Sequence, residues 1–200
     1  SKMILLNALM RLRQICCDLR LLKMKEPEFT DASSGKIAMF GELLEQAVDG
    51  GHRVLVFSQF TTMLGLLKEQ LKAEKIEYCY LDGSTTNRGA VVEKFQNSQI
   101  PVFLISLKAG GVGLTLTGAD TVVHFDPWWN PAVEDQATDR AHRIGQTRVV
   151  TSYKLIARGT VEEKILALQK KKRAIIKATL GGEETLGDNL TWEEIQEIFA

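Results

Sequence analysis

Short apolar runs alternate with helical repeats of apolar residues along most of the chain. Five apolar runs have the length and polar flanks of buried strands, at 54–58, 76–81, 102–105, 121–125 and 149–156. Between these runs, apolar residues recur at helical spacing, most clearly in 60–71. Strands that alternate with helices predict an α/β fold, with a mostly parallel central sheet that is covered by helices on both faces.

Helical patterns also flank the alternating region. A first amphipathic helix is predicted at 3–22, and a polar stretch that ends in Ser33-Ser34-Gly35 is interpreted as a linker. Asn130-Pro131 predicts a helix N-cap followed by proline at the first helical position. The predicted organisation has three parts: a leading helix and linker at 1–35, an α/β domain at 36–157, and two C-terminal helices at 158–200.

Composition narrows the classes of partner. The 200 residues include 25 Lys+Arg and 25 Asp+Glu, so the net charge is zero. Dedicated DNA-binding domains are often strongly basic. Binding of nucleic acid would therefore need a local patch. No apolar run reaches the length of about 18 residues that spans a membrane, so we expect no membrane partner.

The cysteines indicate a compartment. Cys16, Cys17 and Cys79 have neither the spacing of a zinc site nor that of a disulfide framework. A reducing, intracellular location is expected, and no metal site is predicted. Because a helical pattern already occupies the first residues, we also expect the chain to be part of a longer protein.

The segment DQATDRAHRIGQ (135–146) carries the strongest chemical signal. On a helix, Gln136, Arg140 and Arg143 would share one face. Two neighbouring arginines repel each other unless an anion lies near both. They could be arginine fingers that neutralise the charge of a triphosphate during phosphoryl transfer. The alternative is a solvated helix face on which Asp135 and Asp139 balance the arginines.

A glycine-rich segment, LISLKAGGVGLTLTGAD (104–120), follows a predicted strand. Gly110, Gly111 and Gly113 allow successive backbone N–H groups to turn toward one anion. Ser106 and Lys108 add a hydroxyl and a cation, so a phosphate of ATP or of DNA would suit the segment. A tight turn that needs glycine only for its geometry is the competing interpretation.

Three further segments carry weaker signals. In DPWWNP (126–131), one tryptophan could stack on a base or sugar while the other lies in the core, or both could be structural. LDGSTTNRG (81–89) could contact a sugar–phosphate backbone or form a plain capped turn. The basic run Lys170–Arg173 is more typical of a solvated helix face than of a DNA contact.

Together, these segments resemble the second-lobe motif series of the Swi/Snf family of ATP-dependent DNA translocases, which belongs to the superfamily-two helicases. The resemblance covers nearly the whole chain, through LRQICCDLRLL, VLVFSQFTTML, YLDGSTTNRGAVVEKFQ, the long segment 104–147, RGTVEEKILALQKKK and LTWEEIQEIF. It implies a RecA-like three-layer αβα domain with flanking N-terminal and C-terminal helices.

The resemblance also implies residue roles. Arg140 and Arg143 would be arginine fingers, Gln136 a supporting contact at the nucleotide, and Gly111 and Gly113 neighbours of the nucleotide cleft. The residues that would face DNA are Ser106, Lys108, Trp129, Asn130, Ser58, Gln59 and Thr85.

The implied cofactor is ATP with Mg²⁺, and the implied partners are double-stranded DNA and a first RecA-like lobe. A DNA-bound protein is a further expected partner, as the target of remodelling. The sequence has no GxxxxGK[ST] phosphate loop, so this chain alone is expected not to hydrolyse ATP. Two alternatives stay open: the lobe of a strand-separating DNA or RNA helicase, and a non-catalytic module that binds nucleic acid or protein.

Overall fold

The structure is a computed structural model, and it describes residues 2–22, 34–109, 113–178 and 189–200. The helices are α1 (Lys2–Cys17), α2 (Gly35–Asp49), α3 (Thr61–Ala73), α4 (Arg88–Gln96), α5 (Pro131–Thr138), α6 (Val161–Ala178) and α7 (Trp192–Phe199), with a short 3-10 helix η1 (Leu19–Leu22). The strands are β1 (Val54–Ser58), β2 (Tyr78–Leu81), β3 (Val102–Ser106), β4 (Thr121–His124) and β5 (Thr151–Lys154).

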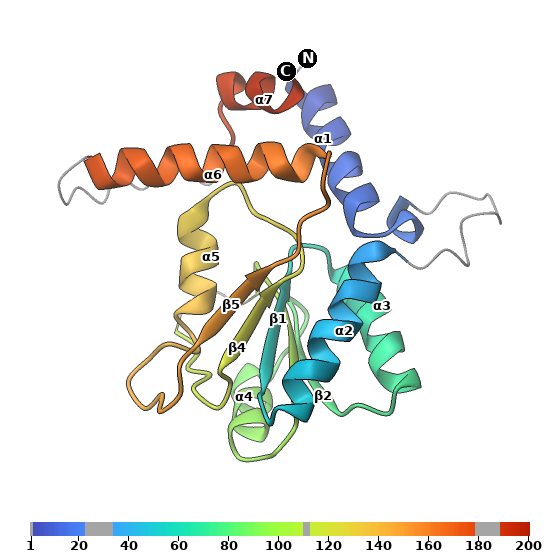
Figure 1. Cartoon of the computed structure of the whole chain (residues 1–200), viewed down its shortest axis with the longest axis vertical. Coiled ribbons are helices and arrows are strands. Elements are labelled where there is room, and N and C mark those ends of the chain that lie inside the picture. Colours follow the sequence, from blue (N-terminus) through green and yellow to red (C-terminus); the bar gives the residue numbers. More distant parts are fainter. Residues whose placement is uncertain (1, 23–33, 110–112, 179–188) are drawn as a thin grey trace.

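The strands form one parallel sheet in the order β2-β3-β1-β4-β5 (Figure 1). Every residue of the three central strands is buried, as their continuous apolar runs predict. Side chains alternate between two cores: Val54 and Val56 pack with α2 and α3, whereas Leu55 and Phe57 pack toward α4 and α5. The predicted α/β fold with helices on both faces is confirmed.

Local signals place several helix ends. Ser34 caps α2 by accepting a hydrogen bond from the Ile37 amide, and Gly50 ends that helix. Asn130 caps α5 and Pro131 follows at its first position, as predicted. α1 ends at Cys17, five residues earlier than the predicted helix, and a 3-10 turn follows it.

A buried ion pair joins α2 to α6, close to the Ser34 cap of α2. The Lys36 ammonium lies 2.6 Å from Glu162 Oε1 and donates to the Phe125 carbonyl at 2.8 Å. The second Glu162 oxygen accepts from the Ala157 amide at 2.8 Å. The first turn of α6 is thereby fixed to α2 and to the residue that follows β4.

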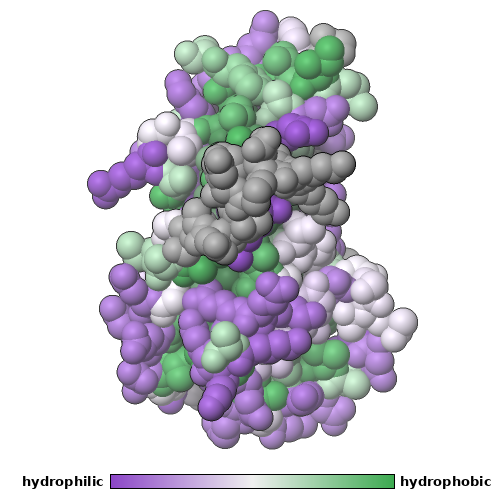
Figure 2. Space-filling view, turned by 90° about the vertical axis from the view of Figure 1, so that its right-hand side faces the viewer, coloured by the Kyte–Doolittle hydropathy of each residue, from purple (hydrophilic) through white to green (hydrophobic). Residues whose placement is uncertain are grey.

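α1, α6 and α7 form a separate group of helices at the carboxyl end of the strands (Figure 1). Their buried contacts include Leu9, Ile165 and Ile195 and reach Trp128 and Trp129. Other apolar side chains of this group stay exposed, and Figure 2 shows them gathered at the end of the molecule that carries α1 and α7. They include Met3, Ile4, Trp192 and Phe199. No described helix combines the length and the apolar character needed to cross a bilayer.

The basic run of α6 serves this packing. Lys171 pairs with Glu197 and Lys172 with Glu194, both on α7, while Arg173 pairs with Asp135 on α5. Three of the four basic side chains are therefore committed to neighbouring helices. The predicted solvated face is wrong at Lys172, which is buried against α7.

Candidate nucleotide and DNA sites

The two arginines of the strongest motif do not share a helix face. α5 ends at Thr138, and Arg140 and Arg143 lie in the turns that follow it. The Arg140 carbonyl accepts from the Leu116 amide at 2.9 Å, so it leaves the helical hydrogen-bond pattern for a tertiary one. The two arginines therefore lie at the far end of α5 from the end of β4.

The turns nevertheless bring the arginines to the glycine-rich segment. Arg143 is exposed, and its Nη1 lies 3.4 Å from the Gly113 carbonyl and 3.5 Å from Thr115 Oγ1. Burial, followed by the neighbouring charge of Arg143, lowers the pKa of the Arg140 guanidinium. Gly113 has a positive φ of 92°, a conformation that favours glycine. Gly111 lies outside the described residues.

Described carboxylates do little to neutralise Arg143. Asp135, one of the two residues that could balance the arginines, forms a bidentate pair with Arg173 instead, at 2.6 and 2.7 Å. Within the described part of the chain, no carboxylate lies within 4.0 Å of the Arg143 guanidinium. Gln136 is exposed on α5, before the arginines. The arrangement suits an anion, such as a phosphate, that approaches from solvent.

Gln146 anchors the turns at 139–146, called the arginine segment because they carry Arg140 and Arg143. This residue was not singled out from the sequence. Its side-chain amide nitrogen lies within hydrogen-bond distance of the Thr117, Ala119 and Ala141 carbonyls, at 3.1, 2.7 and 3.0 Å. Its oxygen accepts from the Arg148 amide at 2.9 Å. This side chain therefore ties the turns after α5 to the segment that leads into β4.

We expect Gln146→Ala to lower the free energy of unfolding of this chain by about 1–3 kcal/mol, because carbonyls that are largely buried lose their donor. Gln136→Ala is the matched control: Gln136 is exposed, and its removal should change stability by less than about 0.5 kcal/mol. Urea unfolding followed by circular dichroism measures both. Equal effects of the two variants would show that the clamp does not hold the segment.

Four of the seven predicted DNA-facing residues gather at the carboxyl ends of β1 and β3. Ser58 and Ser106 are register partners on these strands, and both are buried. The Ser58 hydroxyl donates to one oxygen of the Asp126 carboxylate. The backbone N–H of Gln59 donates to the other oxygen at 3.2 Å. Lys108 is exposed just beyond β3. The structure thus brings four expected residues and the end of β4 to one edge, with Lys108 reaching solvent.

The tryptophans of DPWWNP are packed inside the protein. Trp129 is 9% exposed, and its ring stacks on Trp128 with 3.9 Å between the ring centroids. The guanidinium of Arg13 lies over both rings, at 5.2 Å from Trp128 and 5.0 Å from Trp129. This geometry favours a structural role for both rings. A contact between Trp129 and DNA stays a prediction, as it does for Asn130, which is buried and caps α5.

Thr85 belongs to a hydrogen-bonded turn. Its hydroxyl accepts from the Asp82 amide at 3.0 Å, and the Asp82 carboxylate accepts from Ser84. The Ser84 hydroxyl is the main reason why the pKa of Asp82 is lowered. These bonds account for the polar residues of the turn without a ligand, so the phosphate contact of Thr85 stays a prediction.

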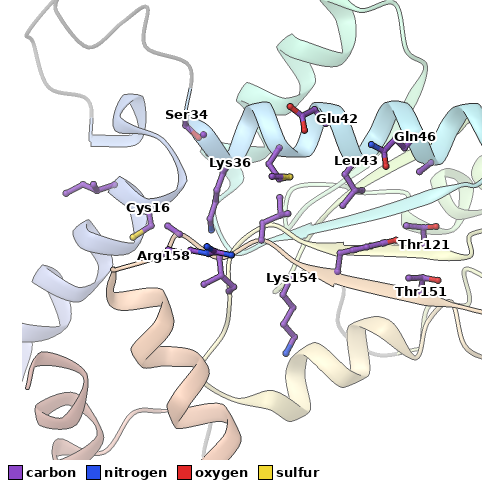
Figure 3. A pocket seen from close by; sticks show the side chains of 18 of the residues that line it. Cys16, Ser34, Lys36, Glu42, Leu43, Gln46, Thr121, Thr151, Lys154 and Arg158 are labelled. Carbon is purple, nitrogen blue, oxygen red and sulfur yellow. The ribbon is translucent and has the colours of Figure 1, made fainter.

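A hollow of about 990 Å³ lies elsewhere, between α1, α2 and the exposed edge strand β5 (Figure 3). Cys16, Lys36, Leu43 and Thr151 are among its lining residues. None of the predicted nucleotide or DNA residues lines it. Of the two arginines, Arg143 is exposed and Arg140 is buried.

Comparison with known proteins agrees with this geometry. Residues 35–145, more than half of the chain, match the family described as the helicase conserved C-terminal domain. The chain belongs to this family. An ATP-dependent helicase of Mycoplasma genitalium is 40% identical over 199 residues, and the chromatin-remodeling ATPase INO80 of Aspergillus oryzae is 47% identical over 152 residues.

Solved structures place this helicase lobe among the Swi/Snf ATPases. The lobe is similar to the Sulfolobus solfataricus SWI2/SNF2 ATPase core in complex with double-stranded DNA, with 36% identity and a TM-score of 0.71. The match covers 98% of this chain and 42% of that one. The C-terminal part of the Fun30 ATPase domain is 38% identical with a TM-score of 0.67, over 80% of this chain and 53% of that one. The predicted RecA-like fold and family resemblance are confirmed.

The helicase lobe is short beside its relatives. It spans 19% of the length of the Mycoplasma genitalium protein and 10% of the length of the Aspergillus oryzae INO80.

Proposed function

We propose that this chain is the second motor lobe of an ATP-dependent translocase on double-stranded DNA, and that Arg140 and Arg143 are its arginine fingers. The supporting observation is the Arg143 guanidinium, which is exposed 3.4 Å from the Gly113 carbonyl and beside a second arginine. Closure of a first lobe over this surface would bring the β- and γ-phosphates of a bound ATP to the pair. The arginines would then stabilise the charge of the transferred phosphoryl group.

The residues of this lobe fit ATP only in part. The arginines suit the phosphates and leave the base and the metal to other groups. Across the described ranges, no three His, Cys, Asp or Glu side chains are grouped so that they could hold a metal ion. In this proposal the residues that would hold Mg²⁺ belong to the first lobe, and the metal would supply neutralisation of phosphate charge when bound.

The DNA would lie along the carboxyl end of the sheet. Lys108 is exposed there, next to the Ser58 and Ser106 pair, and could meet a backbone phosphate. The similar SWI2/SNF2 core, solved with double-stranded DNA, supports duplex DNA as the partner. Repeated closing and opening of the two lobes would then move the protein along the duplex. A DNA-bound protein in its path would be the target of remodelling.

The test is ATP hydrolysis by this chain and by a longer protein that includes the first lobe, each with and without blunt duplex DNA. We expect no turnover by this chain alone, because it lacks a phosphate loop. We expect DNA-stimulated turnover by the longer protein. Turnover by this chain alone would place a complete active site within it, and the absence of turnover from both proteins would favour a non-catalytic binding module.

A further inference from the structure

Arg13 is a buried charge in the first helix, far from the arginine segment. Its side chain is fully buried on α1. An ionised group in such a place is strongly unfavourable unless it is paired and hydrogen-bonded. Burial lowers the pKa of Arg13, and the nearby Asp126 carboxylate opposes that shift. An arginine stays charged nonetheless, so its position depends on what its partners provide.

Apart from the Met10 thioether on α1 itself, the described partners of Arg13 lie on two loops of the sheet. Its Nη2 donates to the Pro127 carbonyl at 2.9 Å and lies 3.6 Å from an Asp126 oxygen. The guanidinium carbon lies 5.5, 5.2 and 5.0 Å from the ring centroids of Phe60, Trp128 and Trp129. These partners belong to two segments, called loops here: 58–60, at the end of β1, and 126–130, after β4. One side chain of α1 therefore holds both loops.

The same loops carry four of the seven predicted DNA-facing residues: Ser58, Gln59, Trp129 and Asn130. Asp126, which faces Arg13, also accepts from the Ser58 hydroxyl and from the Gln59 amide. Asn130, the N-cap of α5, follows directly after the stacked tryptophans. Moving the Arg13 guanidinium would shift the carboxylate and the rings against which these groups are set.

We propose that Arg13 is a positioning residue that fixes loops 58–60 and 126–130 in the geometry that binds duplex DNA. It acts through Asp126, the Pro127 carbonyl and the three aromatic rings, and does not itself touch DNA. This inference rests on the proposed function. In addition, it makes the affinity of the lobe for duplex DNA depend on the position of α1.

The experiment uses the full-length protein and measures ATPase rate against duplex DNA concentration for Arg13→Met and Arg13→Lys. We expect Arg13→Met to raise the KM for DNA about tenfold, because a displaced binding group costs one to two orders of magnitude. The KM for ATP and the rate without DNA should stay within about twofold of wild type. Arg13→Lys keeps a charge but loses the planar fork and its stacking, so its KM for DNA should be intermediate.

Two controls separate positioning from folding. Arg11→Met removes an exposed arginine from the same helix and should leave the KM for DNA unchanged. Leu71→Ala removes a buried side chain of α3 outside both loops and should lower Tm without changing that KM.

A KM for DNA in the Arg13 variants that is unchanged, or changed only as much as in Leu71→Ala, would overturn the inference and leave the proposed function standing. If Arg13→Met does not fold, Arg13→Lys decides by the same criterion. A wild-type protein whose ATPase ignores DNA would overturn both proposals.

Discussion

Replacing Arg143 by alanine in the full-length protein is expected to lower ATP hydrolysis by on the order of 10³-fold or more, the usual effect of losing an arginine finger. Duplex DNA binding should stay within a few-fold of wild type, because Arg143 lies at the far end of α5 from the DNA-facing loops. The variant should fold normally, since Arg143 is exposed and its hydrogen bonds to described residues are long, at 3.4 and 3.5 Å. Single-turnover hydrolysis and fluorescence anisotropy with labelled duplex measure the two quantities.

Two further variants sharpen this test. Arg143→Lys keeps the charge but not the bidentate fork, and it should recover only a small part of the rate. Arg158→Ala removes an exposed arginine just before α6 and should leave hydrolysis unchanged. If Arg143→Ala lowered hydrolysis and DNA binding equally in a folded protein, Arg143 would not be an arginine finger.

Lys36→Met is expected to lower the free energy of unfolding of this chain by about 3–5 kcal/mol at neutral pH, because it leaves a buried carboxylate without its partner. The Glu162 carboxylate is fully buried, and Lys36 is its only described ion-pair partner. Adding Glu162→Gln should recover much of the loss, because the double variant no longer buries a charge. Urea unfolding at pH 7.5 measures both variants.

The loss should also depend on pH. Burial raises the pKa of Glu162 above its ordinary value of 4.5, and Lys36 opposes that shift. Without Lys36 the pKa of the folded state rises further, so the folded protein binds more protons than the unfolded one above pH 4.5. Stability of the variant then falls as pH increases through this window. The difference from wild type should be smaller at pH 5 than at pH 7.5, and a difference that did not vary with pH would contradict the assigned role of Glu162.

The sequence predicted the central sheet well, because burial on both faces leaves a local signal. The continuous apolar runs of β1, β3 and β4 are buried in every residue, as expected. β5 is shorter than its predicted run and exposed in all four residues, because it lies at an edge. Its apolar run therefore overstated how much of it is buried.

The candidate sites were harder to predict where contacts between distant segments decide the geometry. The periodicity of 135–146 favoured a continuous helix. In the structure the Leu116 amide donates a hydrogen bond to the Arg140 carbonyl, and Gln146 anchors the turns after α5. The position of Trp129 depends on Arg13, which is distant in sequence and follows no local pattern. The convergence of the arginines on the end of the glycine-rich segment was implied only by the family resemblance.

α5 joins the two ends of this arrangement. It is eight residues long, is capped by Asn130 and is followed directly by the segment that Gln146 holds, so it is a rod of about 12 Å with both ends fixed. A rod held in this way leaves little slack between the loop before it and the turns after it. On the proposed function, a displacement of the arginines at the nucleotide would tilt the loop at 126–130 in the same instant. The times at which the lobe binds and releases DNA would then be set by the stiffness of α5. No further conformational step would be needed between the two ends of the helix.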